Sequence, residues 1–365
     1  TALQFKKESG ATITGLSLTG YTKTIDMKDG GALSNVKIEG VDADPSKSYV
    51  ADATVDVSAW TWVSASAIEI VEISGNISGN VSLDASKAYR LKGAYIVQDG
   101  AKLIIPAGTK IIADAGGTDV YIAVLMGGMI DIQGTEEAPV VITSDLAQPG
   151  DWGGLTICGK AITTAGVNAE AEVGGFKYGG TNANDNSGSV KNLVIKGTGA
   201  QINPESQYNG VSLYAVGSAT VFENIAVING ADDGIEFFGG SATVTNIYLE
   251  NNEDDAVDWT EGWDGEITNT YILHSVDGFS TAFEGDKDNN NPKFINVTSI
   301  CTAPNGGTAL QFKKESGATI SNLYLEGYTK NIDMKDGGAL SNVKIDGADA
   351  DPSKAYNNGT KVDAS

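Results

Sequence analysis

The chain has 365 residues and is acidic, with 24 Lys and Arg residues against 47 Asp and Glu residues and a net charge of −23. A chain of this length can bury a large core. The shortage of cations argues against binding nucleic acid or an anionic membrane surface, because both require positive charge to neutralise phosphates. We expect no nucleic-acid partner, and no apolar run is long enough to insert this segment directly into a membrane.

A long internal repeat dominates the chain, because residues 1–58 recur as residues 308–365 at an offset of 307. Residues 1–49 differ from 308–356 at 8 positions, as expected of diverged neighbouring copies rather than a cloning duplication. We interpret the chain as a window from a longer tandem array, and a single duplication at two ends is the alternative. Residues 1–41 would then be the last coils of a preceding module, and residues 67–365 the main module, ending in the second copy of the 1–58 segment.

Residues 42–66 interrupt the repeating pattern and are the predicted junction between modules. A turn follows Asp42, and further along Trp60 and Trp62 alternate on an expected strand, so that both point to one face. We expect these two rings to cap the open end of a solenoid, and stacking on a sugar ring is the alternative.

Short strands separated by Gly, Asn and Asp turns follow along the rest of the chain, and no long segment has a helical period. Residues 89–112 and 120–144 each resemble one coil of a solenoid, and the segment that begins at Asp151 opens another. Residues 167–187 are polar and rich in Gly, and we expect them to form a long loop that projects from one coil.

A finer repeat places an asparagine in each successive coil, with an apolar residue two positions before it and one after it. The positions are Asn192, Asn224, Asn246, Asn269, Asn296, Asn322 and Asn342. An inward asparagine at a tight turn tolerates left-handed backbone angles, and its amide can bond the amides above and below it. The pattern predicts an all-β fold, a right-handed parallel β-helix (solenoid) with an Asn ladder and inserted loops.

An acidic pattern recurs at the spacing of one coil, so that two groups of carboxylates should lie on stacked neighbours. The residues are Asp232, Asp233, Glu236, Asp254, Asp255 and Asp258. Three interpretations stay open: calcium binding through hard oxygen ligands, glycosidase chemistry by paired carboxylates on adjacent coils, and structural turns with the remaining charges solvated. No consensus calcium loop is present, and we treat calcium as a candidate cation rather than a required cofactor.

Aromatic residues follow the same coils and offer a second candidate site. Trp259 and Trp263 lie in a segment rich in Gly and Asp, and we expect them to be exposed and able to stack on a saccharide ring. Lyases of this fold generally need a cationic group beside the substrate, yet Arg90 and His274 are the only residues of their types in the chain. We therefore predict that the protein is not an enzyme.

Several phrases of the sequence resemble a family of large right-handed β-helix surface proteins of Bacteroidota-type bacteria. They are Gly150-Asp-Trp-Gly-Gly-Leu, Asp232-Asp-Gly-Ile-Glu-Phe-Phe-Gly-Gly and Asp254-Asp-Ala-Val-Asp-Trp-Thr-Glu-Gly-Trp-Asp-Gly, among others between about residues 70 and 300. The resemblance implies the fold and an extracellular or cell-surface location, but no reaction. The tandem repeat departs from the single-module form that is usual in this family.

These observations predict a structural repeat module of an extracellular bacterial fibre, stalk or adhesin. Its expected partners are copies of itself, joined head-to-tail by end-to-end stacking of open β-helix ends. A polysaccharide-binding protein of the cell surface, with surface glycans as partners, is the alternative, and a β-helix glycosidase or lyase is a third.

Overall fold

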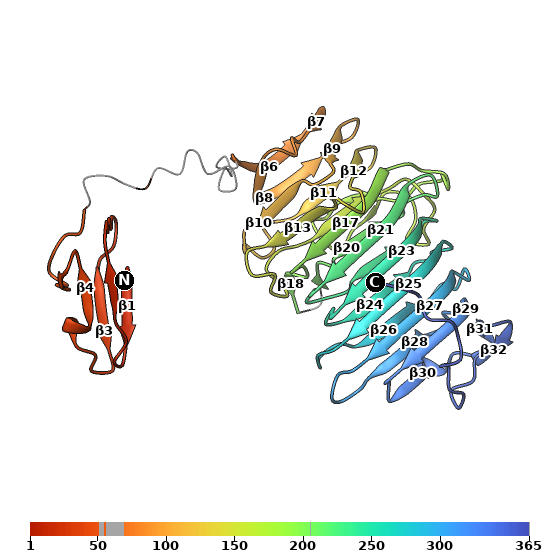
Figure 1. Cartoon of the computed structure of the whole chain (residues 1–365). Coiled ribbons are helices and arrows are strands. Elements are labelled where there is room, and N and C mark those ends of the chain that lie inside the picture. The colour runs from red at the N-terminus through yellow and green to blue at the C-terminus, as the bar shows by residue number, and fades with distance from the viewer. Residues whose placement is uncertain (51–54, 56–68, 205, 365) are drawn as a thin grey trace. The chain divides into compact units, whose positions relative to one another are not determined.

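The computed structural model describes residues 1–50, 55, 69–204 and 206–364. The chain forms two compact units, Thr1–Ala67 and Ile68–Ser365 (Figure 1). Trp60 and Trp62, for which we expect a capping role, lie outside the described residues. No helix in the described part of the chain is long and apolar enough to cross a membrane.

The first unit consists of two short parallel pairs and an antiparallel strand. The first pair is β1–β3, the second is β2–β4, and β5 runs antiparallel to β4. The elements are β1 (Leu3–Lys6), β2 (Ala11–Ile13), β3 (Ile25–Lys28), the short 3-10 helix η1 (Leu33–Asn35), β4 (Val36–Ile38) and β5 (Val41–Asp42).

The second unit is a parallel β-helix, in which almost every strand pairs with the strand one coil away (Figure 1). Its opening coils contain β6 (Ile70–Ile77), β7 (Asn80–Ser82), β8 (Ala88–Val97), β9 (Lys102–Pro106), β10 (Lys110–Ala113), β11 (Ile122–Val124), β12 (Met129–Gln133) and β13 (Val140–Ser144).

Two sides of the stack carry most of the later strands. One side, called the short-strand side, holds β14 (Leu155–Cys158), β20 (Val211–Tyr214), β22 (Ile235–Phe238), β24 (Asp255–Thr260), β26 (Thr281–Asp286), β28 (Thr308–Lys313) and β30 (Lys330–Met334). The other, called the bent side, holds β17 (Gly188–Lys196), β21 (Val221–Ile228), β23 (Thr243–Glu250), β25 (Glu266–His274), β27 (Lys293–Cys301), β29 (Ala318–Glu326) and β31 (Val343–Ile345).

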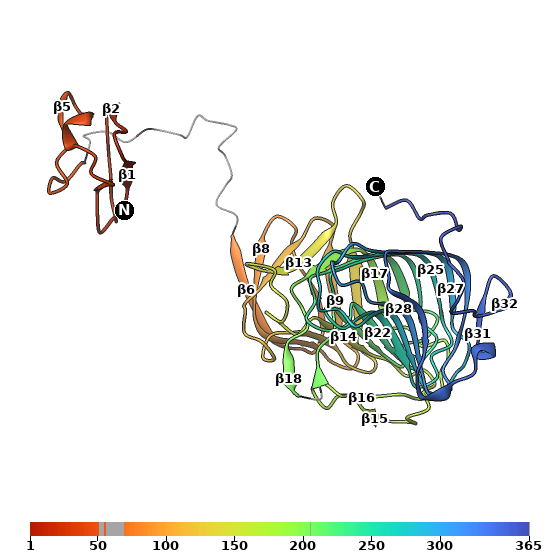
Figure 2. The same cartoon turned by 90° about the horizontal axis from the view of Figure 1, so that it is seen from below.

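The remaining elements are small and lie at the margins of the stack. They are two antiparallel hairpins, β15 (Ala169–Glu170) with β16 (Lys177–Tyr178) and β18 (Gln201–Asn203) with β19 (Ser206–Gln207), the short helices η2 (Lys335–Gly337) and η3 (Leu340–Asn342), and β32 (Ala348–Asp349). Figure 2 shows the two hairpins on the outside of the solenoid.

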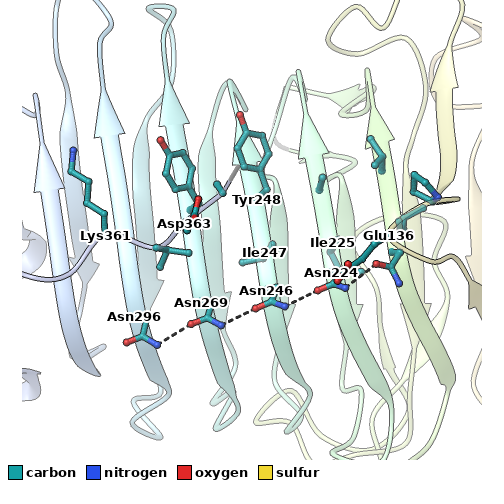
Figure 3. A pocket seen from close by; sticks show the side chains of 18 of the residues that line it. Glu136, Asn224, Ile225, Asn246, Ile247, Tyr248, Asn269, Asn296, Lys361 and Asp363 are labelled. Carbon is teal, nitrogen blue, oxygen red and sulfur yellow. Dashed lines mark hydrogen bonds between the residues drawn. The ribbon is translucent and has the colours of Figure 1, made fainter.

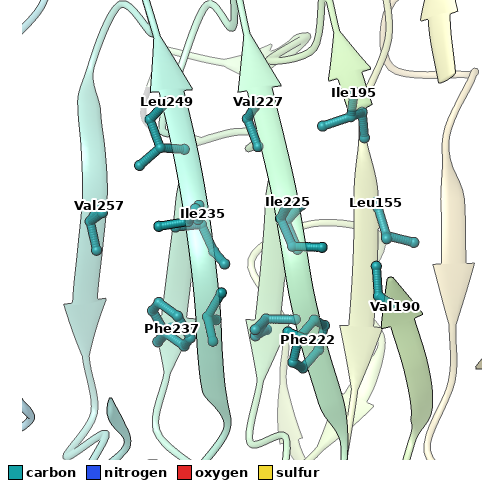
Figure 4. Close-up of a cluster of buried hydrophobic side chains, with 14 of the residues drawn as sticks. Leu155, Val190, Ile195, Phe222, Ile225, Val227, Ile235, Phe237, Leu249 and Val257 are labelled. Atoms are coloured by element: carbon teal, nitrogen blue, oxygen red, sulfur yellow. The ribbon is translucent and has the colours of Figure 1, made fainter. Parts of the chain in front are cut away.

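The core lies inside the coils and is built from ladders of apolar side chains. On the bent side the buried positions lie two before, one after and three after each asparagine, as in Phe222, Ile225 and Val227 around Asn224 (Figure 4). On the short-strand side, Ile235 is in register with Val257 and both are buried. Burial of such ladders is the main favourable contribution to the stability of the fold.

Six asparagines form one continuous ladder along the bend of the bent side, and Figure 3 shows the part from Asn224 to Asn296. The Nδ2 group of each donates to Oδ1 of the asparagine one coil before it at 2.7–3.1 Å, and the first, Asn192, donates to the carbonyl oxygen of Gly134. All six have positive φ, between 48° and 61°. They line an external groove and do not point inward, because the bend turns the amides outward and leaves the core to the flanking apolar residues.

Asn342 does not join the ladder, and its assignment as a seventh rung is wrong. Val343 is in register with Ala318, so Asn342 lies five residues earlier in its coil than Asn322 does. Its Nδ2 group donates instead to the main-chain and carboxylate oxygens of Glu315.

The segment 167–187 also differs from our expectation, because it folds back onto the stack and does not project. Ala171, Val173 and Tyr178 are buried against outward-facing side chains of the short-strand side, such as Tyr214 and Phe238. The segment therefore covers that side and creates a second, smaller core outside the coils.

At Asn246, the free-energy cost of losing ladder hydrogen bonds can be separated from the cost of backbone strain at positive φ. Asn246→Ala removes two amide hydrogen bonds, worth about 1 kcal/mol each, and puts an alanine at φ 60°, which costs about 1–2 kcal/mol more. Asn246→Gly loses the same hydrogen bonds without the steric strain, and glycine adds a smaller entropic cost of about 0.5–1 kcal/mol through the unfolded chain. We expect urea denaturation followed by circular dichroism to rank the variants wild type, Gly, Ala in decreasing stability. Equal losses for the two variants would exclude backbone strain as a reason for asparagine here.

Candidate functional site

The parallel register of the short-strand side brings the predicted acidic residues together. Glu236, Asp258 and Glu284 occupy one outward-facing ladder on β22, β24 and β26. Asp233 precedes β22, and Asp255 begins β24 at the equivalent position of the next coil. We call the set the acidic cluster, and its members are Asp232, Asp233, Glu236, Asp254, Asp255, Asp258 and Glu284.

Protein donors hold one oxygen of several of these carboxylates. Asp233 Oδ1 accepts the Asp255 N–H at 2.9 Å, and Asp255 Oδ1 accepts the Thr281 hydroxyl at 2.6 Å. Asn209 Nδ2 donates to Glu236 Oε2 at 2.6 Å, and the ammonium group of Lys313 bonds Glu284 Oε2. The bond from the Asp255 N–H to the Asp233 carboxylate is the kind of contact that the structural interpretation predicts, because a turn carboxylate holds a main-chain amide of the next coil.

Six of the seven carboxylates are buried or half-buried, and Asp254 is the exposed member. Asp233, Asp255 and Glu284 are buried, Glu236 and Asp258 are half-buried, and among the members Asp254 is exposed. Segment 167–187 contributes a further carboxylate, Glu172, whose charge acts on the nearby Asp232 and Glu236.

Burial and mutual repulsion both oppose ionisation of these groups. Burial, and then the charge of Asp254, raises the pKa of Asp232 to about 8. The pKa values of Asp233, Glu236, Asp255 and Asp258 are raised well above their usual range, chiefly by burial and further by neighbouring carboxylates. The buried and half-buried carboxyl groups of the cluster therefore share a poorly solvated space, and the ammonium group of Lys313 pairs with one of them, Glu284.

Three overlapping groups within the cluster have the spacing of metal ligands. Each group offers three carboxylate oxygens within 4.8 Å of one another. The groups are Asp232–Asp233–Asp254, Asp233–Glu236–Asp258 and Asp255–Asp258–Glu284. All six acidic residues singled out in the sequence therefore belong to at least one such group, and Glu284 completes the third.

Sequence reasoning missed three neighbours that complete the cluster. They are Glu284, Asn209 and Gln311, none of which belongs to the acidic pattern predicted from the sequence. Gln311 lies next to Glu284 on the same ladder. The coil lengths carried a signal, since Asp258, Glu284 and Gln311 follow one another at steps close to those between Asn269, Asn296 and Asn322.

The predicted glycan-stacking role of Trp259 and Trp263 is wrong, because both rings lie inside the solenoid. Their exposed fractions are 2% and 0%. Trp259 points into the core over Gly285, where a Cβ would lie 2.5 Å from the ring. Trp263 stacks on Phe237 with ring centroids 4.0 Å apart and donates its indole N–H to the carbonyl oxygen of Ala242. Their aromatic surfaces are used for packing.

An open groove lies elsewhere, along the asparagine ladder of the bent side (Figure 3). It has a volume of about 900 Å³ and is lined by the six amides and by Tyr248 and Tyr271, whose rings stack 5.7 Å apart. Residues 360–364 of the same chain line one end of it. The Thr360 N–H donates to Asn322 Oδ1, and Asn322 Nδ2 donates back to the Thr360 carbonyl oxygen.

The raised pKa values predict how stability depends on pH in metal-free buffer. The folded chain keeps protons on carboxyls that the unfolded chain releases near pH 4, so stability falls as pH rises toward about 8. His274, whose pKa burial lowers to about 3, acts in the opposite sense only below its ordinary value near 6.5. We therefore expect the urea midpoint in chelator to fall between pH 6.5 and 8.

Asp258→Asn is the matched variant for this measurement, because it removes one raised carboxyl from the middle of the cluster. Its urea midpoint should depend less on pH than that of the wild type. Equal pH dependence in the two proteins would contradict the assignment of the effect to the cluster.

Comparison with known proteins places the β-helix unit in a family. The family model described as the pectate-lyase-like beta helix domain matches residues 75–363. No curated protein and no solved structure matches the chain at a significant level. The matched residues include all the coils that carry the acidic cluster and the asparagine ladder. The chain therefore belongs to the pectate-lyase-like beta helix domain family.

Proposed function

We propose that the chain is part of a tandem array of β-helix modules, acting as a structural repeat of an extracellular bacterial fibre, stalk or adhesin. One observation carries the proposal: the two copies of the repeated segment fold alike. Leu3 pairs with Ile25 as Leu310 pairs with Ile332, and β2 pairs with β4 in the register in which β29 pairs with β31. Two diverged sequences that keep one fold are what an array of modules requires.

The first copy has apolar surface for which the described residues supply no cover. In the second copy, β26 pairs with β28, and Leu310 and Phe312 are buried. In the first copy, β1 pairs with β3, and no other described strand pairs with it, so that Leu3 and Phe5 are only half-buried. A coil equivalent to β26 fits against β1, as a preceding module of an array would provide.

Each copy ends in the same cap, which affects how modules can be joined. Antiparallel β32 pairs with β31 as β5 pairs with β4. In the turn that follows β32, the Asp351 N–H donates to the Tyr356 hydroxyl at 2.9 Å, and Ala350 and Tyr356 join the core. Asp44 and Tyr49 repeat this contact at 2.8 Å. The antiparallel strand covers the edge with which β31 could pair to another module, so we favour capped modules joined by junction segments over continuous stacking.

The site geometry favours a structural over a catalytic role. Glycosidases need two carboxyls that flank an accessible sugar bond, whereas Asp233, Asp255 and Glu284 are buried beside the coils. The acidic charge and the resemblance to surface proteins support the extracellular location that we propose.

The array is tested by hydrogen exchange at two equivalent strands. In the isolated chain, the amides of β1 should exchange faster than those of β28, because a neighbouring coil covers only β28. In native surface material, both strands should be protected. Fast exchange of β1 in the native material would show that no coil covers it and would contradict the array.

A polysaccharide-binding role is the second candidate. The groove of the bent side supports it, and the sugar site would lie there and not at the predicted tryptophans. Tyr248 and Tyr271 offer aromatic surface beside a row of amides, a combination suited to sugars. Tyr271→Ala should weaken binding on a glycan array at least tenfold. Tyr324 lies on the same ladder but under Lys361, 4.4 Å from the ring centroid, so Tyr324→Ala is the control that should bind normally. The absence of any wild-type binding would exclude this role.

A further inference from the structure

The three ligand groups of the acidic cluster form a continuous row across neighbouring coils. Asp233 belongs to the first and second groups, and Asp258 belongs to the second and third. Glu236, Asp258 and Glu284 come from three successive strands of one ladder. A cation held by the second or third group would therefore connect different coils, and a cation in each would share Asp258 as a bridging carboxylate.

Buried oxygens without partners provide an independent sign that a ligand belongs here. Among the described residues, Glu284 Oε1 and Asp258 Oδ1 have no hydrogen-bond partner, although both atoms are buried. The same is true of Oε1 of Gln311 and Oδ1 of Asn209, which lie beyond the two ends of the row and are 4% and 3% exposed. A buried acceptor left unsatisfied costs free energy, so four of them around one cluster point to a missing electropositive partner.

The donors around the cluster orient it as donors orient the ligands of metal sites. Lys313 bonds one oxygen of Glu284 and leaves the other without a partner. Asn209 bonds one oxygen of Glu236, and Thr281 bonds one oxygen of Asp255. Contacts of this kind fix a carboxylate while its second oxygen stays available to an ion.

We propose that the acidic cluster binds divalent cations, Ca²⁺ in particular, in two adjoining sites bridged by Asp258. The upper site consists of Asp233, Glu236 and Asp258, and the lower site of Asp255, Asp258 and Glu284. The exposed Asp254 marks the end from which an ion enters. The ions clamp the coils of β22, β24 and β26 together and replace repulsion between stacked carboxylates by shared coordination.

The chemistry of the ligands favours Ca²⁺ over other ions. All ligand atoms in the three groups are carboxylate oxygens, with no histidine or cysteine among them, which is unlike a typical zinc or copper site. Calcium accepts six to eight oxygens at about 2.3–2.6 Å in irregular arrangements, so its shell spans roughly 5 Å. Oxygens within 4.8 Å of one another fit that span. Magnesium requires a tighter, nearly regular octahedron.

Calorimetry and thermal melting of the whole chain test the proposal. After treatment with chelator, the wild type should bind Ca²⁺ saturably with more than one ion per chain. Its melting temperature should rise by several degrees in millimolar Ca²⁺ and fall again with EDTA. The absence of saturable binding would overturn the proposal.

Asp258→Asn separates bridged sites from a merely acidic surface, because its effect should change sign with calcium. In chelator it should melt above the wild type, since it removes repulsion between stacked carboxylates. In Ca²⁺ it should melt below the wild type and bind fewer ions. A melting difference that does not depend on Ca²⁺ would refute the shared ligand.

Two further variants complete the test. Asp333→Asn is the matched control, because Asp333 follows Gln311 on the same ladder but lies outside the three groups and pairs with Lys330. It should bind Ca²⁺ like the wild type, and an equal loss in this variant would overturn the assignment. Glu284→Gln should lose the lower site alone and therefore bind fewer Ca²⁺ ions than the wild type. If Asp258→Asn does not fold, unchanged Ca²⁺ binding by Glu284→Gln would refute the lower site.

Discussion

Parallel stacking places every residue of this β-helix about 4.8 Å from its counterparts in the coils on either side, and the rest of the structure depends on that constraint. Whatever side chain occupies a position meets a similar environment above and below. Apolar residues such as Ile235 and Val257 gain from this arrangement, because like packs well on like. Asparagine gains as well, because its amide is both donor and acceptor and can bond the amides on both sides.

The same stacking destabilises carboxylates, because an ionised carboxylate can only accept hydrogen bonds and cannot donate one to its neighbour. Stacking Glu236, Asp258 and Glu284 therefore brings together three groups that cannot satisfy one another. The ladder continues with Gln311 and then Asp333, which has Lys330 beside it, so the repulsion is confined to a few coils. The ladder of amides and the ladder of carboxylates show that side-chain chemistry decides whether a stacked row can satisfy itself or requires bound protons or cations.

The sequence was informative wherever a ladder kept its period. Six of the seven predicted asparagine rungs lie in one ladder, and the acidic residues meet because they recur at one coil length. The prediction for Asn342 was wrong because the same flanking apolar residues recur there, in Leu340-Ser-Asn-Val, around a 3-10 turn. The local likeness therefore concealed a shift of register. The expectation that the two tryptophans are exposed was wrong because long-range partners turn both rings inward. Trp259 lies over Gly285 of the next coil, which has no side chain to obstruct it, and Trp263 stacks on Phe237. The fold of segment 167–187 depends on long-range contacts with Tyr214 and Phe238 that no local pattern encodes.

The two ends of the β-helix differ, and this difference bears on how an array is built. At the first coil, β6 pairs with β8 and β7 with β9, and no other described strand covers their outer edges. At the last coil, β32 covers the outer edge of β31, and the turn from Asp351 to Tyr356 follows it, whereas among the described strands β30 pairs with β28 alone. Continuous stacking would need free edges at both ends, because each new pair uses one edge from each module. With the edge of β31 covered, we infer that the junction, rather than edge pairing, sets the spacing of modules in the array that we propose. In the array that we propose, a module added by gene duplication would not expose a new β31 edge for pairing between chains.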